Sequence, residues 1–417
     1  AVKDGSSLVV GHTLKKRSVS GQVRHTIRLT RPQGACVLLC GCQAKSGGDE
    51  AFGAPRARTG LPQSTMGWVE NLKRFGLNGT VDLSMNRVGS IGAGQLSDLL
   101  AYNSTVESLD LRETILGPEG ATHLARMLRT NTHLVTLDLA SNAIEDQGAT
   151  ALAEAIKRNT VLVKLELQRN GISSEGALHI AEALRVNTSL EYLGFAFNGF
   201  GDKGATHLAD VLKGGVNTSL KHLDLGFNGV CVEGARALAD ALTENHWLET
   251  MELGYNAITD RGALELAKAV RCNTVLTSLG MPSNGISDEG ARELARALKD
   301  NVSLIQMGLS FNQIGDDGAQ ELASVLQINR ALETLYLEEN ELVEDGRGAV
   351  ALKNVLESTF RLKAIDAQYQ VAFVMGSHER LGAQSYLVLL EPSLLQEILR
   401  YTQDRVRRDI QYYRQST

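Results

Sequence analysis

The sequence predicts an α/β solenoid: a curved stack of strand–helix units, with the strands in one parallel concave sheet and the helices on the convex side. Three observations predict it. The 417-residue chain repeats every 28 residues, and each unit has a marker residue, almost always asparagine, followed six residues later by a glycine. An apolar pattern typical of a strand precedes each marker, and one typical of a helix follows each glycine. Units of this length cannot bury their apolar faces alone, so they must stack.

Composition agrees with a folded, soluble protein and excludes several other classes. The chain is 43% hydrophobic and 22% charged, which excludes a disordered or collagen-like protein. It has no apolar run of 18 residues, so no membrane span is expected. Residues 1–60 are basic, and the rest of the chain is acidic enough that no nucleic-acid partner is expected. The five cysteines give no disulfide framework and are typical of a reducing compartment.

Residues 1–63 are predicted to form a basic, irregular extension. Residues 5–48 contain seven Lys or Arg and no Asp or Glu. This composition resembles an organelle transit segment or a basic arm, and a flexible extension is the alternative. The extension also contains Cys36, Cys40 and Cys42, but their CxxxCxC spacing lacks the usual CxxC pair, so no metal site is predicted. Residues 64–77 predict an N-terminal capping helix with an apolar stripe.

Residues 78–366 are predicted to hold about ten 28-residue units and a degenerate eleventh strand. Thr114 replaces the marker asparagine in the second unit, and Gly214 and Gly215 form a two-residue insertion. The marker asparagines are expected to form a structural ladder, bonding backbone groups of their own and the adjacent turn. They are Asn86, Asn142, Asn170, Asn198, Asn228, Asn256, Asn284, Asn312 and Asn340.

The third unit illustrates the expected strand and helix. Leu137 and Leu139 alternate with polar or small residues as in a strand, whereas Ala149, Leu152 and Ile156 have helical spacing. An Asp or Ser two residues before most of the glycines, here Asp146, predicts an N-cap of the same helix. A second repeated asparagine, such as Asn159, is expected to close the helix in the left-handed conformation.

Residues 367–417 predict a C-terminal helical cap. Leu362 and Ile365 mark the eleventh strand, after which the period is lost. A new helical pattern starts at Glu391 and Pro392 and extends to Ile410. A cap at this end would give the last repeat a polar outer face.

The repeat resembles the leucine-rich repeat, LxxLxLxxN, in its 28-residue ribonuclease-inhibitor-like form, over roughly residues 66–366. Its GAxxLAxAL helices are similar to those of Nod-like receptor tails and Ran GTPase-activating proteins. The resemblance implies a horseshoe whose concave sheet binds another protein. The chain lacks the GxxxxGK[ST] of a nucleotide-binding module, and it ends RVRRDIQYYRQST where Ran activators carry an acidic tail. The string LLEPSLLQEIL is similar to the first helix of an F-box, which would imply a ubiquitin-ligase adaptor.

The concave positions differ between the two halves of the chain. One strand position forms an acidic line through Asp82, Asp110, Asp138, Glu166, Asp224 and Glu252. Units five to nine have a small floor instead, at Gly194, Ala196, Gly226, Gly254, Gly280 and Gly308. A bare floor edged by aromatic rings favours partner binding, although packing of the rings along the ridge is the alternative. The predicted partner-binding residues are Phe197, Phe227, Tyr255, Phe311, Tyr192, His222, Glu252 and Tyr336.

No catalytic residue, cofactor or metal site is predicted, because the chain contains no HExxH, GxSxG or Rossmann glycine pattern. We therefore expect a non-catalytic scaffold that binds one or more proteins, either as a free adaptor or as an accessory subunit of a larger complex. The alternatives are a GTPase-activating or other enzyme-regulating repeat protein and an F-box-like adaptor. The expected location is intracellular: the cytoplasm, or a plastid or mitochondrion if the acid-free N-terminus is a targeting remnant.

Overall fold

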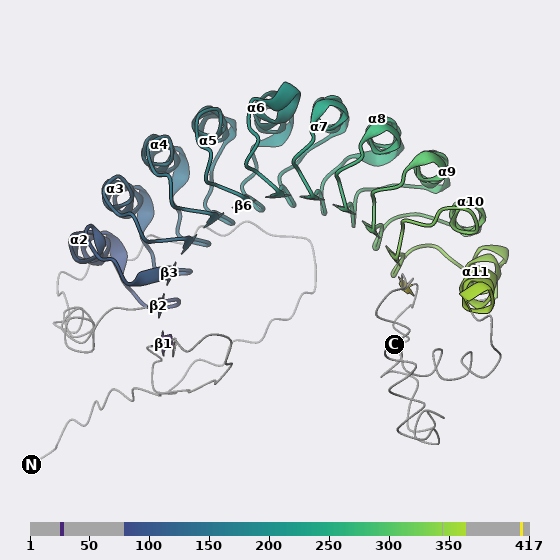
Figure 1. Cartoon of the computed structure of the whole chain (residues 1–417), viewed down its shortest axis with the longest axis horizontal. Helices are drawn as coiled ribbons and strands as arrows, with labels where there is room; N and C mark the ends of the chain where they lie inside the picture. Colours follow the sequence, from purple (N-terminus) through teal and green to yellow (C-terminus); the bar gives the residue numbers. More distant parts are fainter. Residues whose placement is uncertain (1–25, 29–78, 344, 364–408, 412–417) are drawn as a thin grey trace, which may run out of the picture.

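The computed structural model describes residues 26–28, 79–343, 345–363 and 409–411. They form an arc with the strands on its inner side and the helices on its outer side (Figure 1). The predicted α/β solenoid with a parallel concave sheet and convex helices is therefore confirmed. No helix in the described part of the chain is both long and apolar enough to cross a bilayer.

Strands and helices alternate along the arc, one of each per unit. The strands are β1 (Thr26–Arg28), β2 (Gly79–Asp82), β3 (Val106–Asp110), β4 (Thr136–Asp138), β5 (Lys164–Glu166), β6 (Tyr192–Gly194), β7 (His222–Asp224), β8 (Thr250–Glu252), β9 (Ser278–Gly280), β10 (Gln306–Gly308), β11 (Thr334–Tyr336) and β12 (Asp409–Gln411). The helices are α2 (Gly89–Leu100), α3 (Gly117–Leu128), α4 (Glu145–Ile156), α5 (Ser174–Leu184), α6 (Gly201–Leu212), the 3-10 turn η2 (Lys213–Gly215), α7 (Val232–Glu244), α8 (Thr259–Cys272), α9 (Asp288–Asp300), α10 (Asp316–Leu326) and α11 (Arg347–Lys363).

Neighbouring strands pair in parallel and in chain order from β1 to β12. From β3 to β11 the register matches equivalent positions, so Leu137 of β4 lies beside Leu109 of β3 and Leu165 of β5. Successive side chains of a strand point to opposite faces. The in-register pairing therefore turns each concave sequence position into a continuous column of side chains across the sheet.

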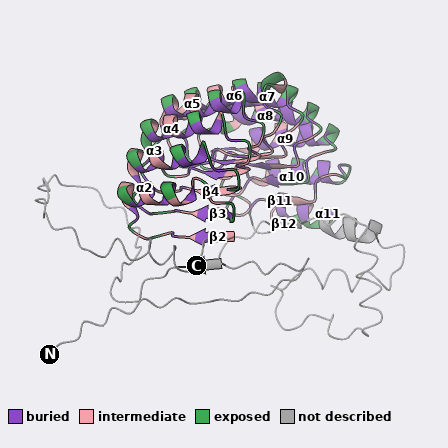
Figure 2. Ribbon diagram, turned by 60° about the vertical axis from the view of Figure 1, so that its left-hand side comes forward, coloured by how far each residue is buried: buried purple, intermediate pink, exposed green. Residues whose placement is uncertain are grey.

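The apolar face of every unit is buried between the sheet and the helices, whereas the outer helix surfaces are exposed (Figure 2). In the third unit Leu137, Leu139 and Leu152 are fully buried. The repeated glycine brings adjacent helices close together: a Cβ on Gly148 would lie 2.9 Å from Cβ of Ala121 in α3. Both predicted apolar patterns thus face a single core that runs the length of the arc.

The marker asparagines bond the chain where it leaves each strand. Oδ1 of Asn170 accepts hydrogen bonds from the backbone N–H of Asn142 at 2.9 Å and of Ile144 at 3.3 Å. Its Nδ2 donates to the carbonyl oxygens of Leu139 and Leu167, each at 3.0 Å. The side chain is fully buried and links two consecutive units.

The helix-closing asparagines form a second ladder, and the predicted left-handed conformation is wrong for three of them. Asn245, Asn273 and Asn301 are extended, with φ between −86° and −74°. In the third unit, Nδ2 of Asn159 donates to the carbonyl oxygen of Leu128 at 2.7 Å, and its Oδ1 accepts from the N–H of Leu162 at 2.7 Å. The side chain thus caps the previous unit's helix and also bonds the backbone that leads into β5.

Four of the predicted N-caps, all aspartates, bond the helix of the following unit instead of their own. Oδ1 of Asp202 accepts from the N–H groups of Cys231 at 2.6 Å and Gly234 at 2.9 Å, at the start of α7. Equivalent bonds run from Asp146, Asp260 and Asp288 to α5, α9 and α10. These aspartates lie inside the first turn of their own helices, so their carboxylates lean toward the neighbouring unit's free N–H groups.

The ends of the solenoid differ from prediction. Leu362 lies in α11, not in an eleventh strand; Lys363 replaces the buried leucine found at this position in other units, such as Leu335. The strand beside β11 is β12, so Ile410 is not helical.

At the other end β1, within the predicted irregular extension, pairs with β2. Both added strands use the backbone groups of a sheet edge. The predicted N-terminal capping helix and Cys36, Cys40 and Cys42 lie outside the described residues.

Candidate functional site

The residue before each marker position has a left-handed backbone, and it forms one rim of the concave face. Phe197, Phe227, Tyr255 and Phe311 have φ between 55° and 59° at this position. The backbone N–H of Phe197 donates to the carbonyl of Gly226 at 2.8 Å, and that of Phe227 donates to Gly254 at 2.9 Å. Each turn is thereby tied to the next unit, and consecutive side chains at this position stand in a row.

Three aromatic rings of this row stack on one another; we call Phe197, Phe227 and Tyr255 the aromatic stack. The ring centroids lie 3.8 Å apart between Phe197 and Phe227 and 4.0 Å apart between Phe227 and Tyr255, with interplanar angles of 13° and 12°. The guanidinium carbon of Arg169 lies 4.4 Å from the ring centroid of Phe197 and covers one end. The three residues nevertheless remain 36%, 38% and 42% exposed. Ridge packing and surface exposure therefore coexist in the same rings.

Tyr192 and His222 occupy a different column, at the start of β6 and β7. Their rings are 5.9 Å apart, and Nζ of Lys164 lies 4.2 Å from the Tyr192 ring centroid. Burial, followed by the nearby Glu166 carboxylate, raises the pKa of Tyr192 to about 12. Tyr192 therefore stays neutral and acts as a hydrogen-bonding, aromatic surface next to the acidic column.

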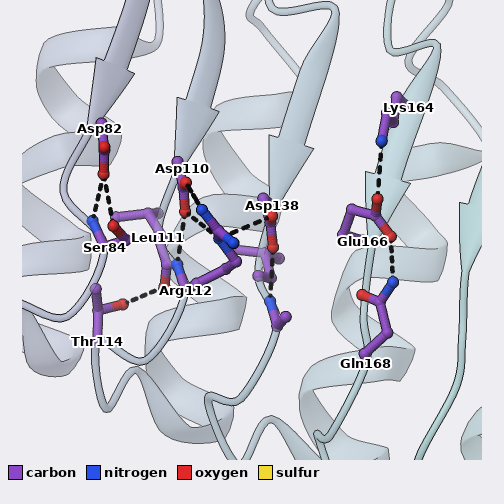
Figure 3. Close-up of polar contacts among 12 residues, drawn as sticks. Asp82, Ser84, Asp110, Leu111, Arg112, Thr114, Asp138, Lys164, Glu166 and Gln168 are labelled. Atoms are coloured by element: carbon purple, nitrogen blue, oxygen red, sulfur yellow. Dashed lines mark hydrogen bonds and ion pairs between the residues drawn. The ribbon is translucent and has the colours of Figure 1, made fainter. Parts of the chain in front are cut away.

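The strand register places the residues of the acidic line in one column across the sheet. In the N-terminal part of this column, Arg112 neutralises the carboxylates. Arg112 contacts Asp110 at 2.6 Å and Asp138 at 3.1 Å (Figure 3). Its hydrogen bond to Asp110 raises the pKa of Arg112 further. Burial raises the pKa of Asp138 to about 6, and repulsion from Asp110 and Glu166 adds to this effect. A hydrogen bond from the backbone and the charge of Arg112 act in the opposite direction but are weaker. This part of the face is an internally paired network.

Glu166, a member of the acidic line, is buried. Its carboxylate lies over Gly194, where a Cβ would collide with it. Lys164 forms an ion pair with Glu166 at 2.9 Å, and the Gln168 amide donates to the same carboxylate (Figure 3). The predicted floor at Gly194 is therefore filled by a neighbouring side chain.

Glu252 repeats this arrangement without the polar partners. Its carboxylate lies over Gly280, where again a Cβ would collide with it. Thr250 and Gly254 stand where the Glu166 unit has Lys164 and Gln168. Within the described part of the chain no cation pairs with Glu252 or with Asp224 beside it on β7. Burial, and then the charge of Asp224, raises the pKa of Glu252 to about 7, and burial also raises that of Asp224.

Glu252→Gln is expected to raise the free energy of unfolding by about 1–3 kcal/mol at pH 8 and to change it little at pH 5. The folded-state pKa of about 7 exceeds the ordinary value of 4.5, so the folded chain holds this proton more tightly than the unfolded chain. Ionisation therefore costs stability from about pH 4.5, and the full cost is reached above pH 7. Urea denaturation at both pH values measures it, with the exposed Glu182→Gln as the control. Equal effects at pH 5 and pH 8 would contradict the shift.

A pocket of about 280 Å³ opens on the concave face next to Glu252, toward the last strands. Its floor is the backbone of β9 and β10, and aromatic rings stand around it. Pro282 and Ser310 complete one side. The residues that give it its character are Glu252, Tyr255, Gly280, Gly308, Phe311 and Tyr336.

The structure divides the predicted partner-binding residues between the aromatic stack, the column of Tyr192 and His222, and the pocket. Phe197, Phe227 and Tyr255 form the aromatic stack, and Phe311 lies 6.4 Å beyond Tyr255. The sequence did not predict that each glutamate would lie over a glycine one unit later, Glu166 over Gly194 and Glu252 over Gly280. The only signal was the 28-residue spacing between the members of each pair. Within the described residues, no group of three or more His, Cys, Asp or Glu side chains could hold a metal ion.

Seven segments of the chain match a sequence profile described as "Leucine Rich repeat". They are residues 130–153, 158–181, 186–209, 216–239, 244–267, 272–295 and 308–323. Together with the sheet and its period, these matches confirm that the chain contains leucine-rich repeats folded as a solenoid. A search of curated proteins gives no significant match.

Three solved structures are similar in part. The structure described as "Leiomodin-1 Actin-Binding Site 2 (ABS2)" is 21% identical, covering 40% of this chain and 96% of that chain with a TM-score of 0.30. The "TLR13-ssRNA13 complex" is 20% identical, covering 66% of this chain and 35% of that chain with a TM-score of 0.42. The tropomodulin C-terminal domain of Caenorhabditis elegans is 21% identical, covering 37% and 94% with a TM-score of 0.30.

Proposed function

We propose that this leucine-rich-repeat chain is a non-catalytic scaffold that binds a partner protein through the concave face of strands β6 to β11. The aromatic stack is the observation that carries the proposal. Aromatic side chains are the residues that most often anchor protein interfaces. Here three of them stand in a row on the rim of the concave face, exposed by 36–42%, and Tyr255 also lines the pocket.

Preorganisation of the stack favours binding. Each ring stands on a turn whose backbone is bonded to the next unit, and Phe227 is held between its two neighbours. A partner would therefore order few side chains on this surface, and ordering costs about 0.5–1.5 kcal/mol per flexible side chain. The N-terminal part of the face is less suited, because Arg112 is already paired with Asp110 and Asp138.

Site-specific photocrosslinking in cells tests the proposal. A benzoylphenylalanine at Phe227 should capture a partner that mass spectrometry identifies, whereas the same residue at Tyr102, after helix α2, should not capture it. Capture of the same protein from Tyr102 but not from Phe227 would move the interface off the concave face. Gel filtration of the cell extract then separates the two settings: a free adaptor elutes near 45 kDa, and an accessory subunit elutes with a larger complex.

GTPase activation is the alternative function, and we expect purified protein to leave GTP hydrolysis by a Ran-type GTPase within about twofold of its basal rate. An arginine that stabilises phosphoryl transfer must be free to reach the nucleotide. Arg112 is held by two carboxylates, and Arg169 lies over Phe197. Single-turnover hydrolysis measures the rate. Stimulation that disappears in Arg112→Ala or Arg169→Ala would favour the alternative.

A further inference from the structure

We propose that the pocket beside Glu252 binds an arginine side chain of the partner protein. The inference rests on the proposed function, because it specifies the chemistry that the partner brings to the concave face. It follows from a comparison of two equivalent sites in the same sheet, from the charges around the second site, and from the shape of the pocket.

The chain contains a filled version of the site. At β5 and β6, the Glu166 carboxylate over Gly194 is met by Lys164, whose Nζ lies 2.9 Å from Oε1 of Glu166 and 4.2 Å from the ring centroid of Tyr192. A carboxylate, a cation and an aromatic ring thus come together. At β8 and β9, the Glu252 carboxylate lies over Gly280 in the same way, but Thr250 replaces the lysine. The carboxylate is present there and the cation is missing. Ser278 replaces Tyr192, and the rings beside this carboxylate belong to other positions, Tyr255 and Phe311.

The neighbouring charges do not supply that cation. Asp224 of β7 adds a second carboxylate, and His222 stands at the other end of the same strand. The described cations elsewhere on or beside the concave face are already engaged: Arg112 with Asp110 and Asp138, and Lys164 with Glu166. Two half-buried carboxylates without a counter-ion are costly in the free protein, so a cation from outside is favoured.

The walls of the pocket favour arginine. Tyr255 and Phe311 provide ring surfaces, the Glu252 carboxylate lies over Gly280, and only backbone atoms border Gly308, which leaves the floor open there. A volume of about 280 Å³ is suitable for one long side chain. A planar guanidinium stacks on aromatic rings while it donates two parallel hydrogen bonds to a carboxylate, which an ammonium group cannot do. This chain already places a guanidinium against a ring of the same row, where Arg169 covers Phe197.

An NMR titration of the full chain with a short peptide tests the assignment. The probe is acetyl-Gly-Arg-Gly-amide, and its matched control has citrulline, which keeps the shape of arginine without the charge. The arginine peptide should shift the amide signals of Gly280 and Gly308 with millimolar affinity, and the citrulline peptide should bind at least fivefold more weakly. Glu252→Gln should lower arginine-peptide affinity at least fivefold, whereas Glu166→Gln, with its carboxylate already paired, should leave it within twofold.

Three results would overturn the assignment: equal binding of the two peptides, unchanged affinity in a folded Glu252→Gln protein, or shifts confined to residues away from the pocket. The chain's own basic segment is the competing occupant. If neutralising Lys15, Lys16 and Arg17 in the full chain raised peptide affinity tenfold, that segment would occupy the pocket and the partner assignment would be wrong. If any of these tests failed while a crosslinker at Phe227 still captured the partner, only the arginine assignment would be wrong. The scaffold proposal would stand.

Discussion

Asn170→Ala is expected to lower the free energy of unfolding by about 3 kcal/mol, the largest stability effect of any single substitution considered for this chain. The Asn170 side chain is fully buried. Its loss removes the acceptor of the Asn142 N–H and the donor to the Leu139 carbonyl, both in the preceding unit. Each buried backbone group left unpaired costs about 1–3 kcal/mol. Urea denaturation followed by circular dichroism measures the loss.

The adjacent turn residue provides a matched control for this ladder prediction. Arg169→Ala removes an exposed side chain from the same turn and should change stability by less than about 1 kcal/mol, because only its contact with Phe197 is lost. Asn256→Ala should behave like Asn170→Ala, since Asn256 forms corresponding bonds between its own unit and the preceding one. A loss below about 0.3 kcal/mol at both asparagines would contradict the ladder.

Replacing Phe197, Phe227 and Tyr255 together by Ser is expected to weaken the partner complex by at least about 2 kcal/mol, or roughly thirtyfold. The change removes the whole aromatic stack from the concave rim. Serine suits the position, because Ser141 and Ser283 have the same left-handed backbone in other units, with φ of 58° and 52°. Calorimetry with the partner identified by crosslinking measures the affinity.

The triple variant should remain folded. Two stacked ring pairs are lost, which costs about 1–3 kcal/mol in total. A control with more exposed apolar residues away from the stack is Tyr102, Val186 and Val302 to Ser, which should leave affinity unchanged. Normal binding by the aromatic variant, or equal losses in both variants, would show that the stack only supports the ridge.

Replacing Asp110 and Asp138 together by Asn should chiefly alter the association rate of the partner and the salt dependence of that rate.

Periodicity specified which residues face the core, but it did not specify which unit each polar side chain serves. Asp202 and Asn159 illustrate the difference. Both were assigned to the ends of their own helices, and both bond a neighbouring unit instead. Within one unit a cap and its helix end are adjacent in sequence, so the local assignment is natural. Stacking brings equivalent helix ends close together across units, and the free N–H or C=O group of an adjacent unit is then the nearer partner.

The repeat pattern alone predicts the solenoid, its parallel sheet, the marker asparagines and the aromatic row. Each of these follows from a fixed spacing of residue types, and in-register stacking makes every position of a unit a column. The contacts of each side chain are visible only in the folded chain. The Glu166 carboxylate lies over Gly194 of the next unit and pairs with Lys164 of its own unit, whereas the equivalent Glu252 borders a pocket. Repetition fixes where a side chain stands, but its contacts depend on the surrounding side chains, which differ from unit to unit.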